Sequence, residues 1–180
     1  MTGDDRTRPL AVLDTSFWVA GCWADVAANS LDLFRIVVPA AVEVEIRATL
    51  ADQPQREYAY ATLFRHLRDK MLDPPGGFVK RIDGYGPGEA EAISLARDLG
   101  ALVLINERPG IALALSLGLH VVTVPALVVA VCAAGVVSER AARRRLDLIE
   151  RVTSPQIIAQ ARAALDALAT IPAEERAADT

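Results

Sequence analysis

Four carboxylates of this chain follow or adjoin apolar segments in positions where they can bind a divalent cation. They are Asp14, Glu45, Glu89 and Glu107. Two of them come directly after or close behind short apolar runs, and the other two lie on predicted helices that follow loops. In a parallel sheet the carboxyl ends of the strands share one edge, where ligand crevices form. We therefore expect these four side chains to approach one another.

The grouping of carboxylates has a defined chemistry. Several carboxylates in a crevice of low dielectric repel one another and do not all stay ionised unless a cation compensates them. Oxygen ligands without His or Cys favour magnesium or manganese. Such sites activate water and stabilise charge during in-line attack on a phosphodiester. The alternative is that Asp14 is a turn residue and that each glutamate is a solvated helix residue.

Strands and helices alternate along the chain, which predicts an α/β fold with a mainly parallel sheet flanked by helices. We predict strands at 10–13, 36–38, 78–82, 101–105 and 120–124. We predict helices at 17–29, 31–34, 40–50, 55–71, 88–99 and 109–117, a buried helix ending near Gly135, and helices capped by Ser138 and Ser154. Either Thr15 or Ser16 is expected to cap the first helix.

Composition limits the class of protein. With 180 residues and 52% hydrophobic content, the chain suits one domain with an ample core. A net charge of −4 excludes a generally basic nucleic-acid binder but permits a local basic patch. Cys22 and Cys132 match no disulfide framework or zinc spacing, so we expect reduced cysteines and a cytoplasmic location. The apolar stretch 121–137 contains Pro125 and predicts a strand and a buried helix rather than a membrane span.

The glycines near residue 86 do not form a nucleotide-binding loop. No Gly-Lys-Ser/Thr follows them, and Glu89 stands where a dinucleotide fingerprint has its third glycine. This argues against a small-molecule enzyme of the Rossmann type.

Four ordered segments resemble the PIN-domain nucleases. They are DTSFW after an apolar run, VVPAAVEVEI, GPGEAEAISLARDLGALVLINER and LALSLGLHVVTV, and the similarity around them spans roughly residues 10–135. The chain is similar to a subgroup of predicted nucleic-acid-binding PIN proteins related to the VapC toxins. The resemblance implies a PIN-like three-layer fold with extra C-terminal helices. It divides the chain into a disordered N-terminus (1–9), a PIN-like domain (10–137), packed C-terminal helices (138–170) and a flexible tail (171–180).

The resemblance also implies roles for individual residues. Asp14, Glu45 and Glu89 match the metal-binding acids of the family, with Glu91 as a neighbouring candidate. Where the family has one or two Asp residues after the next strand, this chain has Asn106 and Glu107, and either one replaces the metal-binding Asp. Thr15 or Ser16 could add a hydroxyl ligand, although helix capping explains both equally well.

The function implied by this resemblance is a Mg²⁺- or Mn²⁺-dependent endoribonuclease that hydrolyses RNA phosphodiesters. Its expected partners are RNA, a second copy of the chain and a cognate antitoxin protein, with no membrane involved. The alternative is a PIN-like module that cleaves weakly or not at all and binds nucleic acid or protein. The neutral Asn106 supports this alternative.

Two further groups of residues have open interpretations. Arg140, Arg143 and Arg144 share one side of a predicted helix and either contact RNA phosphates or form a solvated face paired with nearby acids. Trp18 and Trp23 are five residues apart on the first predicted helix, and we expect core or dimer contacts for them rather than stacking on bases.

Overall fold

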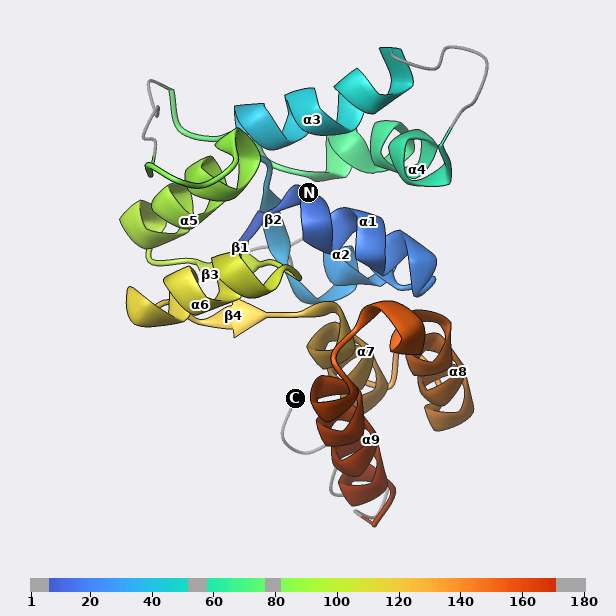
Figure 1. The fold of residues 1–180 in the computed structure, drawn as a ribbon. Helices are drawn as coiled ribbons and strands as arrows, with labels where there is room; N and C mark the ends of the chain where they lie inside the picture. Colours follow the sequence, from blue (N-terminus) through green and yellow to red (C-terminus); the bar gives the residue numbers. More distant parts are fainter. Residues whose placement is uncertain (1–6, 52–57, 77–81, 171–180) are drawn as a thin grey trace.

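A parallel sheet forms the centre of the molecule in the computed structural model, which describes residues 7–51, 58–76 and 82–170 (Figure 1). Its strands are β1 (Leu10–Leu13), β2 (Arg35–Val37), β3 (Leu102–Leu104) and β4 (Val121–Val122), in the spatial order β2-β1-β3-β4. Every pairing of these strands is parallel. The predicted α/β class is therefore confirmed.

The helices of the described residues agree with most of the predicted ones to within a few residues. They are α1 (Thr15–Trp23), α2 (Ser30–Leu33), α3 (Ala40–Ala51), α4 (Ala59–Leu67), α5 (Pro87–Leu99), α6 (Arg108–Ser116), α7 (Val124–Ala133), α8 (Glu139–Ile149) and α9 (Pro155–Thr170). Short 3-10 turns occur at η2 (Ala27–Asn29), η3 (Arg68–Lys70) and η4 (Glu150–Val152). Gly100 adopts a φ of 60° and ends α5, as its position predicted.

Three predicted details need comment. The expected helix 17–29 is wrong in extent, because α1 ends at Trp23 and the chain turns at Asp25, which has a φ of 54°. The expected cap is also wrong: Asp14, not Thr15 or Ser16, is the N-cap of α1 and accepts a hydrogen bond from the backbone of Ser16. Most of the predicted strand 78–82 and the first residues of the predicted helix 55–71 lie outside the described residues.

Both faces of the sheet are covered, which explains why its strands are apolar without alternation. One face carries Ala11, Leu13, Ile36 and Leu104, which share a core with residues of α1, α4 and α7. The other face carries Val12, Val37 and Val103, which share a second core with residues of α5 and α6. Successive residues of each strand thus enter different cores, giving the three layers that were predicted.

Helices α7, α8 and α9 form a group at one side of the sheet (Figure 1). The apolar stretch that begins at β4 divides as predicted, because Thr123 caps α7 and Pro125 lies in its first turn. Ser138 caps α8 in the same way. Within the described residues, no helix combines the length and apolarity needed to cross a membrane.

The N-terminal segment is partly fixed to the sheet. The carbonyl of Pro9 accepts a hydrogen bond from the backbone of Arg35, and the guanidinium of Arg8 donates to the carbonyl of Leu31. Residues 7–9 thus belong to the fold and not to a disordered N-terminus, which corrects the predicted boundary. Residues 1–6 and the predicted tail 171–180 lie outside the described residues.

Candidate functional site

The carboxyl edge of the sheet brings the ends of β1 and β3 together. The backbone N–H of Asp14 donates to the carbonyl of Leu104 at 2.9 Å, so Asp14 lies beside the residues that follow β3. Because Val12 pairs with Val37, the start of α3 lies on the other side of Asp14. Helices α1, α3, α6 and α7 all begin at this edge, which turns the positive ends of their dipoles towards it.

Asp14 is the most deeply buried of the four carboxylates, with 4% of its surface exposed. Its Oδ2 accepts hydrogen bonds from the backbone N–H of Ser16 at 2.9 Å and from the hydroxyl of Ser16. Burial raises the pKa of Asp14 above its ordinary value, Ser16 opposes this rise, and the charges of Glu45 and Glu107 add to it. Asp14 is therefore a carboxylate whose negative charge is incompletely balanced.

Glu45 of α3 accepts hydrogen bonds from residues of two neighbouring helices, α1 and α5. Its Oε2 accepts a hydrogen bond from the hydroxyl of Thr15 at 2.6 Å, and its Oε1 accepts one from the backbone N–H of Gly88 at 2.7 Å. A Cβ at position 88 would collide with this carboxylate, so only glycine lets the two groups approach so closely. Glu45 thus joins α1, α3 and the start of α5.

Glu89 lies one residue further along α5 and is less completely satisfied. Its Oε1 is buried and makes no hydrogen bond of normal geometry with the described residues. Burial raises the pKa of Glu89, and the charges of Asp14, Glu107 and Glu45 raise it further, while the nearby amide of Gly110 lowers it. A Cβ on Gly110 would collide with Oε1, so this glycine makes room for the carboxylate. A buried polar atom without a partner is rare and calls for an explanation.

Asn106 and Glu107 have different surroundings, which separates the two candidates for the missing Asp. The backbone of Asn106 donates to the Ser16 hydroxyl at 3.0 Å, and its Oδ1 accepts from the backbone of Val124 at 3.2 Å. Asn106 therefore ties the end of β3 to α1 and α7. Glu107 is exposed at the N-cap position of α6, and its charge acts on both Asp14 and Glu89.

These side chains line one cavity of about 780 Å³. Its acidic end contains Asp14, Glu45, Glu89 and Glu107, which we call the acidic crevice, together with Thr15, Ser16 and Asn106. Glu91 is not part of the lining; its carboxylate instead accepts a hydrogen bond from the backbone of Ala41 at 2.7 Å, at the start of α3. The structure thus brings four of the predicted acids together and assigns the fifth to a helix end.

No protein-family model matches this chain, and no curated protein matches it either. The chemistry of the cavity must therefore be inferred from its own residues.

The donors in the acidic crevice suit a hard cation. All are oxygen atoms, and the Oε1 of Glu89 has no hydrogen-bond donor of normal geometry among the described residues. Within the described residues, no three His, Cys, Asp or Glu side chains already stand in a metal-binding arrangement. Coordination of a cation would therefore need side-chain movements, after which the free lone pairs of the carboxylate oxygens could serve as ligands.

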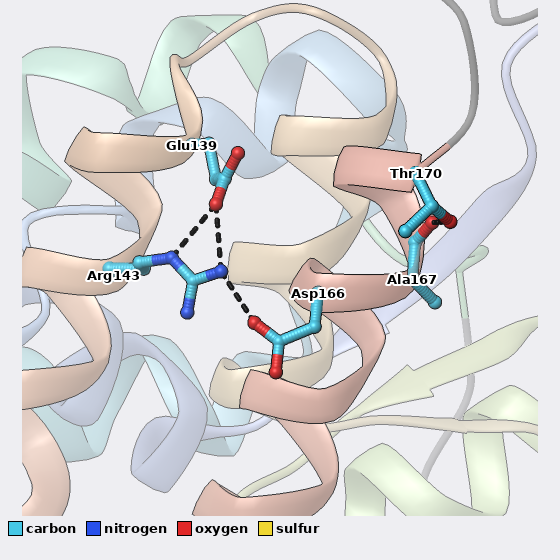
Figure 2. Close-up of polar contacts among 5 residues, drawn as sticks. All are labelled: Glu139, Arg143, Asp166, Ala167 and Thr170. Atoms are coloured by element: carbon cyan, nitrogen blue, oxygen red, sulfur yellow. Dashed lines mark hydrogen bonds and ion pairs between the residues drawn. The ribbon is translucent and has the colours of Figure 1, made fainter.

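The three arginines of the predicted basic face lie elsewhere, on α8, and do not line this cavity. Figure 2 shows that Arg143 is held by two acids: its guanidinium donates to Glu139 on the same helix at 2.7 and 2.9 Å and to Asp166 of α9 at 2.6 Å. Arg140 and Arg144 are exposed. Arg143 thus links two helices, as expected of a paired surface.

Two lining residues were missed or misassigned from the sequence. Arg108 directly follows Glu107 and lines the cavity, and it forms no ion pair with the described residues. Trp18 is a core residue, fully buried with its Nε1 donating to the carbonyl of Tyr60 at 2.8 Å. Trp23 is not: 57% of its surface is exposed, and it lines the cavity. The sequence contained one signal for the position of Trp23 in the cavity. Trp23 lies eight residues after Thr15, and residues at this spacing lie on the same side of a helix.

Proposed function

We propose that this chain is a PIN-type endoribonuclease that uses Mg²⁺ or Mn²⁺ to hydrolyse RNA phosphodiesters. The observation that carries the proposal is the buried Oε1 of Glu89, which lies among three further carboxylates at the carboxyl edge of a parallel sheet and makes no hydrogen bond of normal geometry with the described residues. Such charge without a counter-ion costs free energy unless a cation binds. The resemblance of the sequence to PIN nucleases gives the same residues a metal-binding role.

Asp14, Glu89 and Glu107 would hold the cation, with Glu45 as a further ligand. Ser16 engages Oδ2 of Asp14, which orients the carboxylate and leaves Oδ1 for a ligand. A bound cation would lower the pKa of an attacking water and stabilise the charge that develops on the phosphodiester. Arg108 would bind a phosphate oxygen at the same cavity. Because Asn106 replaces a charged ligand, we expect modest activity that is higher with Mn²⁺ than with Mg²⁺.

The remaining parts of the proposal depend on the sequence resemblance alone. They are a cytoplasmic location, a homodimer and a cognate antitoxin protein that covers the site. Arg140 and Arg144 stay candidates for contacts with RNA outside the cavity, since both are exposed on α8.

Asp14→Asn should lower the rate of RNA cleavage by about a hundredfold or more, because several kcal/mol of charge stabilisation depend on the cation. The fold should survive, since Asn caps a helix as well as Asp does. The assay is cleavage of a single-stranded RNA with Mn²⁺, with Mg²⁺ and with EDTA.

The matched control compares two glutamates of α5. Glu89→Gln should lose activity as Asp14→Asn does. Glu91→Gln should be much milder, because Glu91 lies outside the cavity lining and Gln can still accept the hydrogen bond from Ala41. Normal cleavage by Asp14→Asn, or equal losses at the two glutamates, would refute the assignment of the site.

A second candidate function is a PIN-like module that binds nucleic acid or protein without cleaving it. It is favoured by Asn106, a neutral residue whose Oδ1 already accepts a hydrogen bond from Val124. A wild-type protein that is inert with both cations, and that Asn106→Asp does not activate, would support this candidate.

A further inference from the structure

The cavity extends well beyond the acidic crevice. The end away from the carboxylates is lined by Val19, Ala20 and Trp23 of α1, and Val152 and Ile157 from the chain around the start of α9 line the same cavity. Cavities of roughly 300–1,000 Å³ hold organic ligands of drug size, and the volume here is about 780 Å³. A cation and a phosphate group would fill only the acidic part, so the apolar part has room for a further group of the same ligand.

Helix α1 connects the two ends. Thr15, Val19 and Trp23 lie at positions i, i+4 and i+8, and all three line the cavity, so they form one continuous stripe along the helix. At a rise of about 1.5 Å per residue, Trp23 lies about 12 Å along the helix axis from Thr15. One molecule can therefore touch both the carboxylates and the indole of Trp23.

The exposure of Trp23 is unusual for its surroundings. Trp18, on the same helix, is fully buried and packs edge-on against Phe64 with ring centroids 5.6 Å apart. Trp23 remains 57% exposed, and Val152, which lines the same cavity, is 58% exposed. A large aromatic side chain that stays accessible on the wall of a cavity provides a flat surface on which another ring can stack.

We propose that Trp23 stacks on an unpaired nucleobase of the RNA whose adjoining phosphodiester lies in the acidic crevice. This inference rests on the proposed function and narrows its substrate to single-stranded RNA. A base inside a duplex has both faces covered by its neighbours and cannot lie against an indole. Arg108, which follows Glu107 and lines the same cavity, supplies a positive charge for a phosphate of the bound strand. Stacking tolerates any base, so the cavity selects strand structure more strongly than sequence.

The intrinsic fluorescence of Trp23 tests this stacking directly. The chain has two tryptophans, and Trp18 is fully buried, so quenching by a bound base reports on Trp23. The titration uses the Asp14→Asn variant with Mn²⁺, in which the RNA stays intact, and a short single-stranded oligoribonucleotide. We expect quenching by this RNA, and little quenching by the same RNA in a duplex or with abasic residues.

Substitutions give a second measurement. Trp23→Leu should weaken binding of the single strand by about 5- to 150-fold, the value expected for one lost stack, whereas Trp23→Phe should retain most of the affinity. Leu115→Ala is the matched control, because Leu115 is 58% exposed but does not line the cavity. Circular dichroism of each variant verifies folding, which the exposed position of Trp23 should permit.

The outcomes separate the two proposals. RNA cleavage by the wild type without quenching, and with unchanged affinity in Trp23→Leu, overturns the stacking and leaves the nuclease proposal intact. Quenching of the Asp14→Asn variant by single-stranded RNA, together with no cleavage of RNA by the wild type, supports the stacking and refutes the nuclease proposal. Loss of a dimer on sedimentation of Trp23→Leu, with RNA affinity unchanged, assigns Trp23 to contact with a second copy and overturns the proposal.

Discussion

The acidic crevice and the α8–α9 pair both gather charged side chains, but the crevice collects charges of one sign, whereas the helical pair joins opposite charges in ion pairs. On α8 and α9, Arg143 pairs with Glu139 and Asp166, and Arg162 pairs with Asp147 and Glu150. In the crevice, four carboxylates lie within mutual electrostatic reach. Asp14 and Glu45 accept hydrogen bonds from hydroxyl and amide groups, and the described residues show no ion pair to Asp14, Glu89 or Glu107.

The difference indicates where a ligand belongs. Exposed ion pairs are screened by water and each adds little to stability, so the α8–α9 pair is explained by folding alone. Like charges gathered around a buried carboxylate such as Asp14 oppose folding, and neither packing nor hydrogen bonding explains why they gather at one edge of the sheet. We infer that the crevice is arranged for a positively charged ligand, whereas the surface of the helical pair is arranged for water.

The largest expected effect is stabilisation of the wild type by Mn²⁺. At a free concentration about a hundredfold above Kd, binding to the folded state adds about 2.7 kcal/mol to the free energy of unfolding and raises Tm by about 5–10 °C. Glu89→Gln should abolish most of this rise, because it removes the carboxylate whose Oε1 makes no hydrogen bond of normal geometry with the described residues.

Glu139→Gln is the control from the α8–α9 pair. It removes one partner of Arg143 and should leave the response to Mn²⁺ unchanged. Equal rises in Tm for the wild type and Glu89→Gln would mean that the crevice does not bind the cation.

A smaller effect is expected on the pH dependence of the metal-free protein. The folded-state pKa values of Asp14 and Glu89 lie above their ordinary values of 3.8 and 4.5. Between the unfolded and folded values the folded protein retains protons that the unfolded chain has lost, so the free energy of unfolding falls as pH rises through this range. Each unit of difference corresponds to about 1.4 kcal/mol, and Asp14 should dominate because solvent screens the partly exposed Glu89.

The measurement is the free energy of unfolding by denaturant, for the wild type and for Asp14→Asn, at a series of pH values from about pH 4 to neutral pH without metal. The stability of the wild type relative to the variant should fall as pH rises. A difference that stays flat, or that increases with pH, would show that the charge of Asp14 is already compensated.

The sequence was sufficient to predict much of the fold and the edge where the acids meet. Apolar runs followed by Asp14 and Glu107 imply strand ends, and parallel pairing then brings such ends to one edge. Asn106 and Glu107 could not be distinguished, because their difference depends on contacts with Ser16 and with the start of α7. These contacts join residues distant in sequence, and no local pattern specifies them.

The part of the cavity beyond the acidic crevice could not be predicted from the sequence either. Part of its lining, Val152 and Ile157, comes from the chain around the start of α9, and α9 packs on α7 and α8. Local periodicity predicts that α9 forms but not where it packs. The link from Arg143 to Asp166, which are 23 residues apart, depends on the same docking.

The smallest expected effect separates the two kinds of arginine. Arg108 lines the cavity without an ion pair to the described residues, whereas the guanidinium of Arg143 is held by Glu139 and Asp166. An arginine that neutralises a phosphate releases a counter-ion from RNA, so its loss makes the salt dependence of binding shallower by roughly one unit. We therefore expect Arg108→Ala to reduce the slope of log affinity against log salt by about one unit and Arg143→Ala to leave it unchanged.

The titration measures binding of single-stranded RNA to each arginine variant, made in the Asp14→Asn background, over a range of salt concentrations. A reduced slope in Arg143→Ala would restore the α8 face as an RNA contact, because an arginine already neutralised by two acids has little charge to offer a phosphate.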